Sequence, residues 1–156
     1  MNLILEPFRR CFDYSGRSRR REYWTYAFLT FVVVNLVAYI EDALGLTGAN
    51  GAGRSASPFR GILWLGLMIP GLAVAIRRLH DSDRVGWWVL LPVAPFLYWI
   101  LALAGGFYSE SHFPFVLGAV IVAPLAFLVL MGLPGTRGPN RFGPDPKPEG
   151  LADIFA

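Results

Sequence analysis

The chain has 156 residues, which predicts a single domain. Only 16% of them are charged and 54% are hydrophobic, against about 25% charged in soluble domains, so this composition excludes an ordinary soluble fold. The net charge of +3 is attributed to membrane topology and anionic lipid, not to nucleic acid. The lone Cys11 excludes an intramolecular disulfide, and no ligand spacing predicts a metal or cofactor.

Four apolar blocks follow one another along the chain, and none contains Asp, Glu, Lys, Arg or His. A helix needs roughly 20 residues to cross a hydrocarbon core of about 30 Å. Each block therefore predicts a transmembrane helix. Prolines inside the second, third and fourth blocks are expected to bend helices without breaking them, because neighbouring helices can absorb a kink. The blocks are 23–40, 59–76, 87–108 and 113–133.

Basic residues outside the blocks alternate strongly between the two sides. Segments 1–22, 77–86 and the tail carry twelve, whereas the two other connections carry two. The positive-inside rule places the richer side in the cytoplasm. We therefore predict an all-α membrane protein, a four-transmembrane-helix bundle with both termini cytoplasmic. Its parts are a cytoplasmic segment 1–22, a transmembrane domain 23–133 and a Pro/Gly-rich cytoplasmic tail 134–156.

The flanking segments have patterns of their own. Leu5, Phe8 and Phe12 would share one face of a helix, which predicts a short interfacial helix; a frayed terminus explains the pattern as well. Gly, Ala and Ser dominate 43–58, which predicts a flexible external loop. Five prolines and four glycines in 134–150 predict an extended cytoplasmic segment.

Three polar motifs lie beside the predicted helices. Arginines crowd the entry to the first helix, where the helix dipole disfavours cations, so topology or lipid phosphate explains them better than helix stability. In the second motif, Asp81 stands four residues after Arg77 and could neutralise one arginine. His80 beside Asp81 could form an acid–base pair or a weak metal site. The motifs read GRSRRREYW at 16–24, RRLHDSDRVGWW at 77–88 and PGTRGPNRFGPDP at 134–146.

Taken together and in this order, the three motifs resemble the DUF805 family of small bacterial inner-membrane proteins. The resemblance runs from about Phe8 to Pro146. It implies a four-helix fold in a bacterial inner (plasma) membrane, and no reaction, because the family's function is unknown. Positions 83–85, which read Asp-Arg-Val, depart from the small polar pair that often precedes Gly-Trp in such proteins.

All three motifs fall on the predicted cytoplasmic side, so we expect one composite polar site that binds anions, since the guanidinium fork matches phosphate. Its expected members are Arg17, Arg20, Arg21, Arg77, Arg78, His80, Asp81, Asn140 and Arg141.

The favoured function is a non-enzymatic membrane module that binds anionic lipid headgroups or a protein partner, with a homo-oligomer left open. A small oligomeric transporter or channel is a second hypothesis, which the lack of ionisable residues in the blocks disfavours. A lipid-phosphate enzyme that uses His80 and Asp81 is a third.

Overall fold

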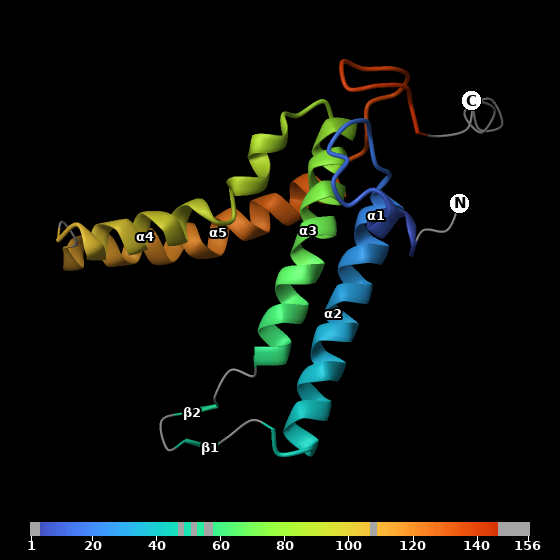
Figure 1. Cartoon of the computed structure of the whole chain (residues 1–156). Coiled ribbons are helices and arrows are strands. Elements are labelled where there is room, and N and C mark those ends of the chain that lie inside the picture. Colours follow the sequence, from blue (N-terminus) through green and yellow to red (C-terminus); the bar gives the residue numbers. More distant parts are fainter. Residues whose placement is uncertain (1–3, 47–48, 51–52, 55–57, 107–108, 147–156) are drawn as a thin grey trace. The chain divides into compact units, whose positions relative to one another are not determined.

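Figure 1 shows the computed structural model of the chain, which describes residues 4–46, 49–50, 53–54, 58–106 and 109–146. The chain divides into two compact units. The first comprises 1–14 and 21–74, and the second comprises 15–20 and 75–156. Nearly all of the regular structure is helical, so the predicted helical class is confirmed. Three helices are long and apolar enough to cross a membrane, and a fourth apolar helix is shorter.

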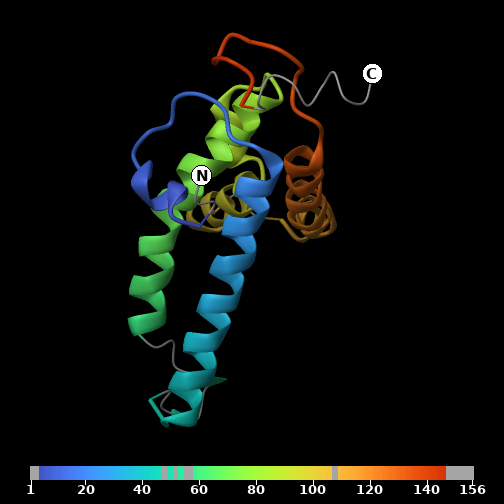
Figure 2. The ribbon, with the colours of Figure 1, turned by 90° about the vertical axis from the view of Figure 1, so that its right-hand side faces the viewer.

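The first unit is a pair of long helices, α2 (Arg20–Ala43) and α3 (Pro58–Asp81), of which α3 continues into the second unit. The two lie side by side in Figures 1 and 2. The Tyr26 hydroxyl of α2 donates to the Leu67 carbonyl of α3. A Cβ at Gly71 would lie 3.1 Å from the Tyr26 ring, so a larger residue there would require the ring to shift by a few tenths of an ångström.

The other end of the helix pair is held by charge. Arg60 of α3 donates from Nε to a Glu41 carboxylate oxygen of α2 at 3.2 Å, and Glu41 is only 3% exposed. Between these helices run two-residue strands, β1 (Ala49–Asn50) and β2 (Gly53–Arg54), which pair in antiparallel register. The predicted flexibility of 43–58 stays a prediction, because part of this loop lies outside the described residues.

The predicted N-terminal helix is present but short. The helix α1 (Glu6–Arg9) has four residues, so Leu5 and Phe12 of the predicted apolar face lie outside it. Phe8 makes an edge contact with Tyr26, with ring centroids 5.8 Å apart. Phe12 is 75% exposed. Packing of the N-terminal segment against the protein therefore accounts for Phe8 but not for Phe12 in the predicted apolar face.

The second unit holds the third and fourth apolar blocks. The third block is not one helix: η1 (Gly86–Leu90), a 3₁₀ helix, is followed by a turn and then by α4 (Ala94–Ala104). The eleven residues of α4 rise only about 16 Å, which is too little for α4 by itself to cross a bilayer core. A second 3₁₀ helix, η2 (Glu110–His112), leads into α5 (Phe113–Gly132), which packs against α4.

The prolines explain this difference from the predicted spans. Pro92 lies in the turn between η1 and α4, and Pro95 lies in the first turn of α4, where its missing N–H costs no helix bond. Two prolines three residues apart remove two N–H donors of one continuous helix. The expectation of an unbroken helix is therefore wrong at Pro92, whereas α3 and α5 continue through Pro70 and Pro124 without a break, as expected. The four-span count and the orientation of the termini remain predictions.

Candidate functional site

A buried ion-pair cluster joins the start of the second unit to the end of α3. The Asp81 carboxylate accepts from Arg78 NH1 at 2.6 Å through one oxygen. Through the other oxygen it accepts from Arg17 Nε at 3.0 Å, and Arg17 NH2 lies 2.9 Å away. The three side chains are between 0% and 8% exposed. We call Arg17, Arg78 and Asp81 the arginine clamp.

The clamp explains where Asp81 finds its partners. Sequence spacing suggested Arg77 at i, i+4, but the carboxylate pairs with Arg78 at i, i+3 and with Arg17 from a distant segment. One carboxylate between two buried guanidinium groups leaves one positive charge uncompensated by a carboxylate. Backbone carbonyls supply the rest of the compensation, because a guanidinium offers five donors in a planar fork.

Those carbonyls belong to the end of α5 and to residues 133–146, which we call the strap. Arg17 donates from NH1 to Gly138 O at 2.6 Å and from NH2 to Thr136 O at 2.5 Å. Arg78 donates from Nε to Met131 O at 3.1 Å, and from NH2 to Leu133 O. The last carbonyls of a helix have no partner within it and attract cations. The clamp therefore caps α5.

The strap in turn caps α3. Thr136 donates to the Asp81 carbonyl from its backbone N at 2.8 Å and from its hydroxyl at 3.2 Å. Asn140 Nδ2 donates to the His80 carbonyl at 2.9 Å. Ser18 N donates to the Arg77 carbonyl at 3.1 Å. The orphan carbonyls at the end of α3 are thus satisfied by segments that the three sequence motifs supply.

Gly135 shows how closely the strap lies on the clamp. A Cβ at this position would lie 2.6 Å from the Asp81 carboxyl carbon, a distance that no side chain tolerates. The glycine of the Pro-Gly pair that follows the fourth apolar block is therefore a packing requirement. It lets the backbone approach the buried carboxylate closely enough for Thr136 to cap α3.

His80 and Asp81 do not form the acid–base pair suggested by their adjacency. The His80 ring lies flat on the Phe142 ring, with centroids 3.9 Å apart and an interplanar angle of 1°. Its Nδ1 lies 3.2 Å from the Gly16 carbonyl. The Asp81 carboxylate is engaged by the clamp instead. Among the described residues, no group of three or more His, Cys, Asp or Glu side chains is placed to hold a metal ion.

The remaining expected site residues fall into an exposed and a buried class. Arg20 is exposed and donates from NH1 to Gly132 O at 3.3 Å. Arg141 is 56% exposed, and its Nε pairs with the half-exposed Asp83 at 3.1 Å. Arg77 is fully buried. Arg21 is exposed in the first turn of α2 and belongs to the other unit, so the structure does not place it relative to the clamp.

The structure thus brings together six of the nine expected residues, and a seventh, Arg20, joins them through the end of α5. Sequence reasoning missed the contributions of Gly16, Ser18, Thr136 and Phe142. Gly16, Ser18 and Thr136 act through backbone groups or, for Thr136, also through an uncharged hydroxyl. Neither kind of group stands out in a sequence read for charge. Phe142 could have been found, because a lone aromatic residue in a Gly/Pro-rich segment needs a partner surface. The six residues are Arg17, Arg78, His80, Asp81, Asn140 and Arg141.

Comparison with known proteins agrees with the family suggested by the motifs. The family described as "Protein of unknown function (DUF805)" matches residues 11–144. The chain is 32% identical to the inner membrane protein YhaH of Escherichia coli K12, over 96% of this chain and 99% of that protein. It is 33% identical to the inner membrane protein YhaI of the same strain, over 94% and 97%.

A third relative, the uncharacterized protein YiiR of Escherichia coli K12, is 27% identical over 86% of each chain. No solved structure matches. The matched region contains the clamp and nearly the whole strap, so the buried ion-pair cluster lies within the part of the chain that these proteins share. This chain belongs to the DUF805 family of proteins of unknown function.

Proposed function

We propose that this protein is a multi-pass module of the bacterial inner membrane whose basic end binds anionic lipid headgroups, with both termini in the cytoplasm. The relatives named inner membrane proteins and the three membrane-length helices support the location. The excess of basic residues outside the apolar blocks supports the orientation. Two termini on one side require an even number of crossings, so in this proposal η1 and α4 together form the crossing that α4 alone is too short to make.

One observation carries the headgroup proposal: the only carboxylate of the clamp, that of Asp81, is paired with the two buried arginines of the clamp. Segments 15–20, 75–90 and 131–146 contain eight arginines and three aspartates. Asp81 is buried between Arg17 and Arg78, so it cannot neutralise any arginine at the surface. The surface of this unit near the membrane boundary therefore keeps an excess of positive charge, carried by exposed side chains such as Arg20 and Arg137. Arg141 is exposed as well, in a weak surface pair with Asp83.

The clamp gives the arginines two distinct tasks. The buried pair, Arg17 and Arg78, has its donors directed at protein oxygens and builds the end of the fold. Arg20 and Arg141 are exposed, and each uses only some of its guanidinium N–H donors in hydrogen bonds to the protein. The remaining donors are available to a ligand. Each basic residue near an anionic leaflet contributes about 1 kcal/mol, so losing two should weaken headgroup binding by more than tenfold.

The test is native mass spectrometry of the purified protein with its lipids retained. We expect the wild type to carry phosphatidylglycerol or another anionic lipid, and the double variant Arg20→Gln/Arg141→Gln to lose most of it. The control is Arg54→Gln, which removes an arginine from the predicted external side and leaves the Arg60–Glu41 pair intact. Equal retention of anionic lipid by all three proteins would refute headgroup binding at this end.

A further inference from the structure

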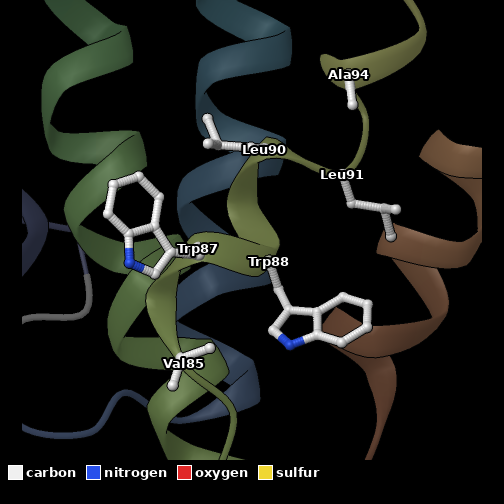
Figure 3. A pocket seen from close by; sticks show the side chains of 6 residues that line it. All are labelled: Val85, Trp87, Trp88, Leu90, Leu91 and Ala94. Carbon is white, nitrogen blue, oxygen red and sulfur yellow. The ribbon is translucent and has the colours of Figure 1, made fainter.

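The break in the third apolar block creates a pocket. It has a volume of about 280 Å³ and is lined by Val85, Trp87, Trp88, Leu90, Leu91 and Ala94. All six residues belong to η1, to the start of α4 or to the residues that flank them, so the pocket lies wholly in the second unit. Figure 3 shows their side chains.

The lining has an apolar body and a polar end. The two indole rings are the only lining groups with a side-chain hydrogen-bond donor. Trp87 is 78% exposed and Trp88 is 45% exposed. Within the described residues, neither indole N–H has a protein acceptor. In Figure 3 both ring nitrogens lie on the side of Val85, away from Ala94.

The basic residue Arg84 directly precedes this polar end. Its guanidinium makes only one hydrogen bond among the described residues, a long one of 3.4 Å from NH1 to the Ser82 carbonyl. From Arg84 through the indoles to Ala94, the chain therefore runs from a cation, through two free N–H donors, to aliphatic carbon. That order matches a phospholipid read from its phosphate, through its ester carbonyls, to its acyl chain.

The pocket's size and its backbone favour the same occupant. Pockets for drug-sized ligands run from about 300 to 1,000 Å³, so this open pocket suits one flexible chain better than a bulky ligand. Non-helical backbone within the hydrocarbon core must be buried in protein or line a water-filled cavity. The break between η1 and α4 follows the two tryptophans by only a few residues, so it is expected at the hydrated membrane boundary, where the ester region of a lipid lies.

We propose that this pocket seats one acyl chain of a membrane phospholipid, with the ester region at the two indole N–H groups and the phosphate toward Arg84. The proposal rests on the proposed function only in placing this end of the second unit at the headgroup layer. The pocket selects a chain and the exposed arginines select a headgroup, so the two can fail separately.

The test is photo-crosslinking in nanodiscs with a phosphatidylglycerol and, separately, a phosphatidylcholine that carry a diazirine in the acyl chain. Peptide mass spectrometry then locates the label. We expect residues 85–94 to be labelled several-fold more than the lipid-facing surface of α5, and equally by both lipids.

Two matched substitutions on α4 separate the pocket from general lipid contact. Ala94→Phe fills the pocket and should reduce labelling of 85–94 by fivefold or more. Ala104→Phe adds the same ring at an exposed position near the other end of α4 and should leave labelling unchanged. Ala94→Leu is the smaller filling variant if Ala94→Phe does not fold.

Uniform labelling of all exposed apolar surfaces would overturn the proposal. So would undiminished labelling in a folded Ala94 variant. Labelling of α5 without labelling of 85–94 would also overturn it, and would mean that a protein surface covers the pocket. If Arg20→Gln/Arg141→Gln loses its anionic lipid but keeps the label at 85–94, headgroup binding and chain binding are separate sites.

Discussion

Replacing Asp81 by Asn should destabilise the protein more than any other single neutral substitution in the three motifs. The amide keeps the shape of the carboxylate but removes its charge, so Arg17 and Arg78 stay buried beside each other. It also places an NH₂ group against one guanidinium that needs an acceptor. Three contacts of 2.6 to 3.0 Å depend on the carboxylate.

The magnitude follows from burial. Breaking a buried ion pair by removing one partner costs about 3–5 kcal/mol, because the remaining charge is left uncompensated. Asp83→Asn is the matched control, since it makes the same chemical change two residues away. The Arg141–Asp83 pair is 56% and 48% exposed, and exposed pairs contribute about 0–1 kcal/mol.

The measurement is the midpoint of thermal unfolding in detergent, followed by size-exclusion chromatography. About 1 kcal/mol corresponds to about 2–4 °C for a chain of this length, so Asp81→Asn should lower the midpoint by about 6–20 °C. Asp83→Asn should change it by only a few degrees. Equal midpoints for the two variants would refute the claim that the clamp holds the second unit together.

Gly135→Ala should destabilise the protein nearly as strongly as Asp81→Asn, because the new Cβ would meet the Asp81 carboxyl group. Gly132→Ala is the control and should be neutral, because a Cβ there meets no other atom within 4 Å. Unchanged thermal midpoints for both variants would contradict the close approach of the strap. Phe142→Ala should cost about 0.5–1.5 kcal/mol by removing the ring that stacks on His80, and proteolysis of the strap should quicken in the same variant. Tyr26→Phe should lower the free energy of unfolding by about 0.6–1 kcal/mol, because it removes the hydroxyl that donates to Leu67 O. Lipid retention should hardly change in this variant, and a loss of lipid would show that the two units depend on each other.

The sequence predicted the helical class and the polar cluster for a simple reason: both depend on charge and hydropathy, which residue types display directly. Motifs on alternate connections must meet on one side, so Arg17, Asp81 and Asn140 could be grouped before any coordinates were known. The sequence could not show the direction of a guanidinium. Arg17 and Arg78 were expected to face an anion, and they face carbonyls of α5 and the strap instead.

The broken third helix was missed because hydropathy does not distinguish a continuous helix from an interrupted one. The signal was present in Pro92 and Pro95, which lie one helical turn apart and each lack the backbone N–H that a continuous helix would need there. In α3 and α5, a single interior proline was tolerated. One interior proline therefore leaves a helix continuous, whereas two prolines three residues apart divide the third apolar block into η1 and α4.

The most direct test of headgroup binding compares two substitutions on one ion pair, because they should act in opposite directions. The dissociation constants of phosphatidylglycerol and phosphatidylcholine would be measured by native mass spectrometry for wild type, Asp83→Asn and Arg141→Gln. Asp83→Asn frees Arg141 and should raise the preference for the anionic lipid, whereas Arg141→Gln should lower it by about fivefold, as expected for about 1 kcal/mol. If the preference is the same in all three proteins, or if both substitutions shift it in the same direction, the exposed arginines do not bind headgroups.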